Sequence, residues 1–213
     1  MPREARMPSP DHTLTSLDEL EALYGSPDPR SRAKETDQLT APYRAFVEAA
    51  PFAVLATRGP DGLDCSPRGD APGFVRVADP HTLLLPDRRG NNRIDSLRNI
   101  LADPAVSLLF LIPGIGETLR VNGTARISTD PDLLDGFSVQ GRVPRTILVI
   151  RIASVFFQCS RAVVRADLWN SDARARRDGV PTAGAMLAAA SGDRHGGPAY
   201  DDGLADRVRA TLY

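Results

Sequence analysis

The sequence predicts a mainly β protein of the α+β class, a six-stranded antiparallel β-barrel with peripheral helices. Its 213 residues suffice for one domain with a sizeable core. Between residues 52 and 157, about six short apolar runs have the alternation or the length of strands. Turn sequences join most of these runs, and short turns favour antiparallel pairing. Helices do not alternate regularly with the strands, which argues against a Rossmann domain.

The N-terminal residues predict a flexible arm with one short helix. Residues 1–15 are rich in Pro, Ser and charge and lack periodicity, which is typical of disorder. Ser16 and Glu19 have the spacing of a capping box, and Gly25 ends the helix that they begin. Residues 27–34 follow as a charged linker.

A second helix and a β-hairpin come next. Asp37 or Thr40 is a suitable N-cap for a helix that extends to Ala49. The apolar, β-prone run at 52–57 and the turn at 59–62 then predict a hairpin whose second strand resumes after the turn.

The remaining elements follow from apolar periodicity and turn residues. Positions 117–128 alternate between apolar and polar residues, so this strand is half-buried. Positions 105–112 are apolar almost throughout and predict a buried strand. The other predicted elements are strands at 82–85 and 146–157, helices at 92–101 and 130–137, and two weak helical stretches after residue 183. We therefore expect three parts: an arm at 1–36, a barrel domain at 37–170 and a helical extension at 171–213 that packs on the barrel.

The composition narrows the possible partners and compartment. With 26 basic and 27 acidic residues, the net charge of -1 argues against nucleic acid or an anionic membrane as the main partner. No apolar run reaches the ~18 residues of a membrane span. The first residues lack the apolar core of a secretory signal, so we expect a cytoplasmic protein. Two cysteines, Cys65 and Cys159, cannot form a disulfide framework.

The densest polar cluster lies between a predicted strand and a predicted helix. It contains Asp87, Arg88 and Arg89, followed after Gly90 by Asn91, Asn92 and Arg93. Asn91 or Asn92 would cap the helix, and the free N–H groups of a first helical turn favour an anion. The segment suits a phosphate site and, equally, a solvated loop with an ordinary cap.

A second candidate is Ser66-Pro67-Arg68-Gly69-Asp70, in which Pro67 and Gly69 interrupt a strand. Glycine lets backbone approach a flat ligand closely, although the same pattern is typical of a β-bulge or an edge strand. On its own, the segment favours the second interpretation.

No catalytic or metal-binding set accompanies these clusters. The three histidines stand apart from one another and from the cysteines. Cys159 fits a buried small apolar residue better than a nucleophile, and Trp169 fits a core residue better than a cofactor contact. If the protein is an enzyme, an organic cofactor supplies the chemistry.

The residues resemble the pyridoxamine 5′-phosphate oxidase-like family of split β-barrel flavoproteins. The resemblance rests on PFAVLATRGPDGLDCSPRGD at 51–70 and on the stretch from LLLPDRRGNNRID to ETLRVNGTARIS at 83–128. QCSRAVVRADLW at 158–169 is similar to a subgroup of FMN-dependent enzymes in that family. The resemblance implies a split barrel that binds FMN.

It also implies a set of FMN contacts. The phosphate would be held by the strand segment with Ser66, Arg68 and Asp70 and by Asn91, Asn92 and Arg93 at the start of the middle helix. Contacts to the flavin would come from Asp87, Thr118 and Phe157, and Arg165 lies near the late arginine of the family. The resemblance identifies no catalytic side chain and no metal ligand.

Departures from the family pattern bear on the substrate. The vitamin oxidases carry an Arg-x-His element near the C-terminus, and this sequence has none after Phe157. They also carry a lysine where Asp70 lies. We therefore expect little oxidation of pyridoxine 5′-phosphate, and a substrate pocket lined instead by the C-terminal segment around Trp169 and residues 180–182.

The resemblance implies a homodimer with the flavin at the interface. The expected function is an FMN-dependent oxidoreductase that acts on a small organic substrate by hydride or electron transfer. The alternatives are a deazaflavin-dependent reductase and a non-catalytic flavin- or haem-binding module.

Overall fold

The computed structural model describes residues 12–170 and 179–213. The chain divides into two compact units, Met1–Lys34 and Glu35–Tyr213. Most of the stretch predicted to be disordered, residues 1–11, lies outside the described residues.

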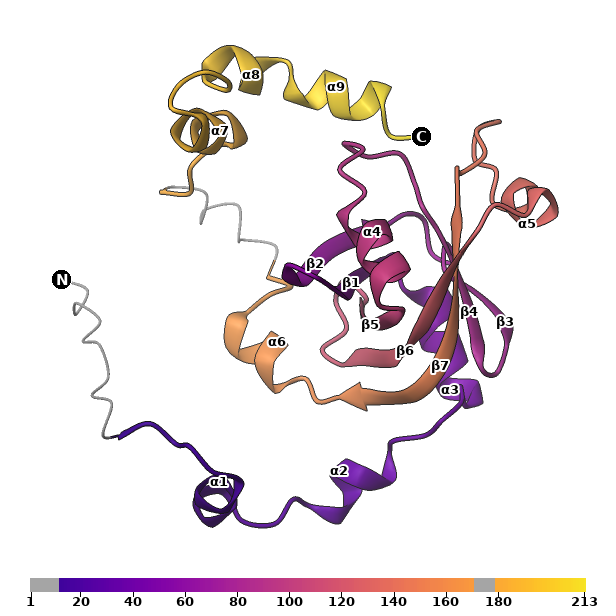
Figure 1. Cartoon of the computed structure of the whole chain (residues 1–213), viewed down its shortest axis with the longest axis vertical. Helices are drawn as coiled ribbons and strands as arrows, with labels where there is room; N and C mark the ends of the chain where they lie inside the picture. The colour runs from indigo at the N-terminus through magenta and orange to yellow at the C-terminus, as the bar shows by residue number, and fades with distance from the viewer. Residues whose placement is uncertain (1–11, 171–178) are drawn as a thin grey trace. The chain divides into compact units, whose positions relative to one another are not determined.

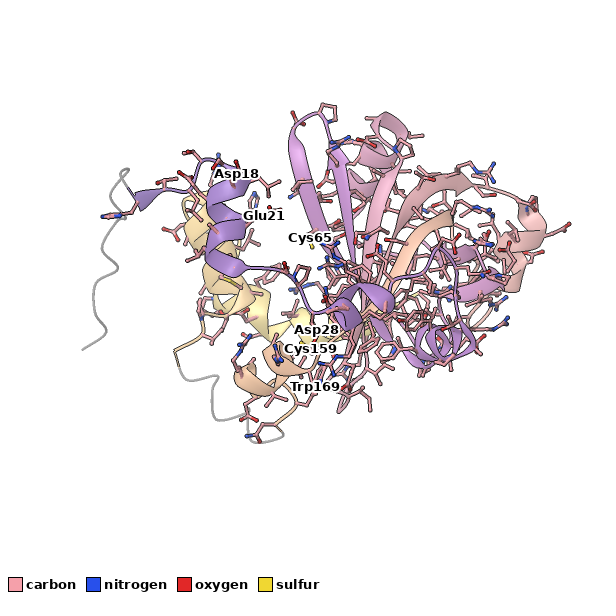
Figure 2. All side chains as sticks on the ribbon, turned by 90° about the horizontal axis from the view of Figure 1, so that it is seen from below. Asp18, Glu21, Asp28, Cys65, Cys159 and Trp169 are labelled. Atoms are coloured by element: carbon pink, nitrogen blue, oxygen red, sulfur yellow. The ribbon has the colours of Figure 1, made fainter. Side chains whose placement is uncertain are left out.

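The first helix of the N-terminal unit, α1 (Leu17–Tyr24), begins at the predicted capping box. Ser16 Oγ accepts a hydrogen bond from the Glu19 N–H, and the Glu19 carboxylate accepts one from the Ser16 N–H, each at 3.2 Å. Gly25 follows the helix with a φ of 68°, a conformation that glycine adopts without strain. The described residues of α1 include no buried side chain, and Asp18 and Glu21 project from it in Figure 2.

A short helix, α2 (Pro29–Ala33), replaces the linker predicted at 27–34. Asp28 (labelled in Figure 2) caps it by accepting a hydrogen bond from the Arg30 N–H at 2.8 Å. Proline suits the first turn of a helix because its missing N–H would have no helical partner there. Asp28 and Pro29 together mark the start of this helix, but the many charged residues around them indicated a linker.

The second unit is built on one antiparallel sheet (Figure 1). Its strand order is β2-β1-β5-β6-β7-β4-β3. The strands are β1 (Phe52–Gly59), β2 (Gly62–Gly69), β3 (Arg76–Asp79), β4 (Thr82–Pro86), β5 (Ala105–Leu111), β6 (Thr118–Ser128) and β7 (Ile147–Gln158). The α+β class is confirmed, with one strand more than the six predicted. The additional strand, β3, has only four residues, of which one is half-buried. It is too short to show the apolar alternation by which the other strands were predicted.

The two faces of the sheet differ in burial. On β1 and β5, alternate residues such as Leu55, Leu108 and Phe110 are fully buried. Their neighbours on the other face, including Val54 and Leu109, are only half-buried. The prediction that residues 105–112 form a strand buried throughout is therefore wrong for one of its two faces.

A β-bulge lies between Asn122 and Gly123, where β6 pairs with β7. A Cβ atom at Gly123 would lie 2.0 Å from the carbonyl oxygen of Arg151. Only glycine permits this approach of the two backbones, which accounts for the glycine inside the strand.

The helices of the second unit are mostly short. They are α3 (Ala41–Ala49), α4 (Asp95–Ala102), α5 (Pro131–Gly136), α6 (Arg161–Ala166), α7 (Ala183–Ser191), α8 (Pro198–Asp202) and α9 (Leu204–Ala210). Thr40 caps α3 as one of the two predicted N-caps, through a hydrogen bond from the Tyr43 N–H. Helix α4 packs against β1, β2 and β6 and covers one face of the sheet (Figure 1).

The start of α4 differs from the prediction. Neither Asn91 nor Asn92 is its N-cap; Ile94 takes that position with a φ of 54° and makes no side-chain capping bond. Asn92 also has a positive φ, of 59°. The helix therefore begins after two left-handed residues, three residues later than predicted.

Candidate functional site

The second strand presents polar side chains toward α4. Asp64, Ser66 and Arg68 alternate along β2 and are half-buried, whereas the residues between them are exposed. This arrangement follows from the period of two in a strand. The interruption that Pro67 and Gly69 suggested is absent, because the pairing of β2 with β1 runs without a shift from Gly62 to Gly69.

A chain of hydrogen bonds fixes Arg68. Its Nη1 donates to Ser66 Oγ at 2.8 Å and to the Pro67 carbonyl at 2.9 Å. Ser66 Oγ lies 3.0 Å from Ser96 Oγ, and Ser96 Oγ donates to Asp64 Oδ2 at 3.2 Å. A guanidinium can only donate and an ionised carboxylate can only accept, so the Ser66 hydroxyl donates to Ser96. The hydrogen bonds therefore run in one direction, from Arg68 through Ser66 and Ser96 to Asp64. They connect two residues of β2 through the first turn of α4.

Burial shifts the pKa of two groups in this region. Burial lowers the pKa of Arg68, against the opposing effect of the carboxylates of Asp87 and Asp64. Burial raises the pKa of Asp87, although the charges of Arg68 and Arg145 partly offset the rise. Both charges are thus held at some cost in a partly desolvated place, where an ionic ligand would interact more strongly than in water.

The loop before α4 brings its polar residues to the same place. Asn91 Oδ1 accepts a hydrogen bond from the Arg93 N–H at 3.1 Å, and Arg93 Nε donates to Asp95 Oδ2 at 2.7 Å. Because Ile94 makes no capping bond, no side chain at the N-cap satisfies the first N–H groups of α4. Such groups attract an anion, and the positive end of the helix dipole adds to the effect.

These elements enclose a cavity of about 860 Å³. This volume lies in the range of small-molecule and cofactor sites. Its described lining holds six arginines and three aspartates: Arg68, Arg88, Arg89, Arg93, Arg142, Arg145, Asp64, Asp87 and Asp95. The remaining polar lining includes Ser66, Asn91, Asn92 and Ser96. The cavity therefore favours an anionic ligand.

Six of the ten residues assigned to the cofactor from the sequence line this cavity: Ser66, Arg68, Asp87, Asn91, Asn92 and Arg93. Asp70 lies beside it and binds two residues that line it, Arg88 and Tyr213. The other three lie outside the described lining. Thr118 is buried and donates to Gln158 at 3.3 Å, Phe157 is 40% exposed on β7, and Arg165 belongs to α6.

The C-terminal end of the chain supplies a site residue that the sequence did not indicate. Tyr213 lines the cavity, and its hydroxyl donates to Asp70 Oδ1 at 2.7 Å. Asp70 and Tyr213 are 143 residues apart, and no local pattern marks either as a partner of the other. Burial alone would raise the pKa of Asp70, but hydrogen bonds from Tyr213 and the Ala71 N–H and the charge of Arg88 lower it. Trp169 and residues 180–182, which were predicted to line the substrate pocket, are not among the described lining residues of this cavity.

The cysteines and Trp169 also differ from expectation. Cys65 and Cys159, both labelled in Figure 2, are exposed, so the prediction of a buried Cys159 is wrong. Trp169 is half-buried, donates from Nε1 to the Ile115 carbonyl at 2.7 Å, and lines a smaller pocket beside α6. Among residues 12–170 and 179–213, no cluster of three metal-ligating side chains occurs.

These features define a protein with an antiparallel sheet and an arginine-rich cavity between one strand and one helix. The sequence pattern of the pyridoxamine 5′-phosphate oxidase family matches residues 39–159. The chain belongs to this family, and the match covers all seven strands.

Solved structures with similar folds include HupZ of Group A Streptococcus, with 20% identity and a TM-score of 0.47 over 57% of this chain and 95% of that one. An F420 reductase has 23% identity and a TM-score of 0.42, covering 56% and 98%. General Stress Protein 26 of Bacillus anthracis has 16% identity and a TM-score of 0.41, covering 53% and 88%. A comparison with curated proteins gave no match. Within the described residues, no helix has the length and apolar character needed to cross a bilayer.

Proposed function

We propose that the protein is an FMN-dependent oxidoreductase that binds the FMN phosphate between β2 and α4. The observation that carries this proposal is the convergence of the half-buried Arg68 and the uncapped start of α4 on one cavity. A phosphate placed there would accept hydrogen bonds from a guanidinium and from helical N–H groups. The cofactor supplies the redox chemistry when bound, and the chain binds it, orients it and excludes water.

The residues present fit a phosphorylated flavin. Arg68 and Arg93 provide charge, and Asn91 and Asn92 add polar groups. Asp95 pairs with Arg93, so a phosphate would compete with this carboxylate for the guanidinium. The side chain of Arg93 is 75% exposed, which leaves it free to reorient toward a ligand. Arg68 is fixed and half-buried and is therefore the main cationic contact.

The proposal extends to the substrate and the assembly. The substrate is a small organic molecule other than pyridoxine 5′-phosphate, because the sequence lacks the Arg-x-His element of the vitamin oxidases. The protein acts as a homodimer through the half-exposed face of the sheet opposite α4. This interface lies on the other face from the proposed FMN cavity, unlike the interfacial flavin that the resemblance implies.

Titration with FMN and riboflavin tests the phosphate site. The wild-type protein is expected to bind FMN far more tightly than riboflavin. A hydrogen bond to a charged group contributes about 1.5–3 kcal/mol, so Arg68→Ala should weaken FMN binding about tenfold or more. Riboflavin affinity should stay the same, because riboflavin has no phosphate.

Arg58→Ala is the matched control for this titration. Arg58 lies on β1, pairs with Asp103 and does not line the cavity. Its variant should bind FMN as the wild type does. Equal affinities for FMN and riboflavin in the wild type would contradict the proposal, whereas tighter binding of a deazaflavin than of FMN would identify the alternative cofactor.

A further inference from the structure

We infer that Tyr213 is a ligand-contacting residue that forms the wall of the cavity at the end opposite the phosphate, held in place by Asp70. The inference rests on the proposed function, since it assigns the ring end of the same bound ligand. Tyr213 lies outside the segment that matches the family, which ends at residue 159. Its role would therefore be a feature of this chain's own C-terminal extension.

The position of Tyr213 follows from the geometry of β2. Ser66 bonds to Ser96 in the first turn of α4, and Asp70 comes four residues further along the same strand direction. A strand advances about 3.3 Å per residue, so Asp70 lies about 13 Å from Ser66 and about 7 Å from Arg68. The backbone of Asp70 continues the pairing of the hairpin through its N–H, which donates to the Pro51 carbonyl at 3.1 Å. A ligand with its phosphate at α4 would therefore extend toward Tyr213.

Three contacts hold Tyr213 at that end. Its hydroxyl donates to Asp70 Oδ1 at 2.7 Å, and its backbone carbonyl accepts from Arg142 Nη1 at 2.9 Å. The guanidinium of Arg88 lies 5.7 Å from the centre of its ring, within the range of a cation–π contact. These contacts come from different parts of the chain, so the ring is fixed rather than loosely placed.

The anchor of Tyr213 is itself rigid. Asp70 Oδ2 accepts from Arg88 Nε at 2.8 Å, and the two side chains are 5% and 16% exposed. Arg88 Nη1 also donates to the Phe137 carbonyl at 2.8 Å. A buried ion pair adds little net stability, because the cost of desolvating both charges offsets most of their attraction. A pair that also bonds a tyrosine at a cavity wall is better explained as a fixed support for that wall.

This end of the cavity has apolar and aromatic residues beside its arginines, Arg88 and Arg142. Val143 and Pro144 follow Arg142 and line the cavity near Tyr213. Together with the tyrosine ring they offer apolar and aromatic surface, which suits a flat aromatic group. The cavity thus adds an aromatic and apolar wall to its arginines, and this combination suits a planar ring system that bears a phosphate.

Three variants test this role through flavin affinity. Tyr213→Ala should weaken FMN and riboflavin by the same factor, about three- to tenfold, because an aromatic pair contributes roughly 0.5–1.5 kcal/mol. Tyr213→Phe keeps the ring and should have a smaller effect. Tyr200→Ala is the matched control, since Tyr200 lies in α8 of the same extension and outside the cavity lining. Unchanged affinity for both flavins in Tyr213→Ala would overturn the inference while leaving the phosphate site intact.

Hydrogen exchange gives a second readout that needs no ligand. Tyr213→Phe removes the bond to Asp70 and should accelerate exchange in α9 several-fold, whereas Tyr200→Phe should not. Unchanged exchange in Tyr213→Phe would overturn the anchoring by Asp70. If the wild type bound neither FMN nor riboflavin, the proposed function and the ligand contact would both fail, and anchoring would still be decided by the exchange result.

Discussion

At the scale of single residues, the proposed phosphate site depends on Arg68, and hydrogen bonds to neighbouring side chains set the orientation of Arg68. The hydroxyls of Ser66 and Ser96 connect it to Asp64, and Ser96 is buried. The same contacts join β2 to α4, so they set the distance between the guanidinium and the helix N-terminus. Ser96 is therefore a positioning residue.

Ser96→Ala should weaken FMN binding about two- to tenfold, the range of one lost hydrogen bond. Riboflavin binding should not change, because only the phosphate contact depends on the orientation of Arg68. In the Arg68→Ala background, Ser96→Ala should cause no further loss of FMN affinity. A further loss equal to that in the wild-type background would show that Ser96 acts independently of Arg68.

The raised pKa of Asp87 predicts a pH-dependent cost to stability. In the unfolded chain, an aspartate has its usual pKa of about 3.9. In the folded protein, burial raises the pKa of Asp87 above that value. The folded state therefore holds the proton more tightly, and stability is lost as pH rises from the unfolded pKa through the folded one. Asp87→Asn removes this loss because its side chain stays neutral.

Thermal unfolding of the wild type and of Asp87→Asn between pH 3 and pH 8 measures the effect. The variant should have the higher Tm at pH 7, and the difference should shrink as pH falls below the unfolded pKa. A Tm difference that stays constant over this range would contradict the assignment of the cost to Asp87 ionisation.

At the scale of elements, the start of α4 holds strained backbone beside the proposed phosphate. Ile94 has a φ of 54° although it is β-branched and 47% exposed. Left-handed backbone costs such a residue about 1–2 kcal/mol, whereas asparagine adopts it more readily. Because isoleucine has no polar side chain, the helix also lacks a side-chain cap and its start stays open to a ligand.

Ile94→Asn should therefore raise the free energy of unfolding by about 1 kcal/mol, measured by urea denaturation. Leu101→Asn is the control, because Leu101 is 79% exposed near the other end of the same helix and has no positive φ. It should not stabilise the protein. Stabilisation by both variants, or by neither, would contradict the strain at Ile94.

The elements that the sequence predicts well are those with a strong local pattern. The hairpin of β1 and β2, the strands β5 to β7, and the capping box of α1 all lie where periodicity and turn residues placed them. The N-cap of α4 could not be predicted, because two asparagines offered ordinary caps and the chain bypassed both. Sequence patterns report local preference, and the packing of α4 on the sheet overrides it here.

The residues of the candidate site likewise separate into those that a local sequence pattern indicates and those that it does not. The strand segment at Arg68 and the loop at 91–93, which the sequence indicates through polar or charged residues at a strand or helix end, both line the cavity. Tyr213 and Arg142 were not indicated by the sequence, since their approach to Asp70 depends on contacts between distant parts of the chain. The hydrogen-bonding role of Ser96 was also hidden, because a serine in a first helical turn is common.

At the scale of the whole molecule, the face of the sheet opposite α4 bears on assembly. It carries polar residues at Arg58, Arg120 and the hydrogen-bonded Ser107, Asn122 and Ser154. Around them lie six apolar cross-strand neighbours: Phe52, Val54, Ala56, Leu63, Leu109 and Phe156. Leu63 is 86% exposed and Phe52 37%. An apolar patch of this kind is typical of a surface that binds another protein, and a second copy of the chain would bury it symmetrically.

Light scattering at micromolar concentration should therefore give twice the chain mass of 23.0 kDa. Leu63→Asp should shift the mass toward the monomer, because a buried charge at the interface is costly. Leu101→Asp, on α4, should leave the dimer unchanged. A wild-type mass of 23.0 kDa would contradict the dimer.

A crystal structure of the protein grown with FMN tests the central claim most directly, because it locates the phosphate. The account predicts phosphate oxygens within hydrogen-bond distance of the Arg68 guanidinium and of the first N–H groups of α4, with the flavin ring directed toward Tyr213. A flavin bound elsewhere on the sheet, with Arg68 still directed only at Ser66 and Pro67, would contradict it.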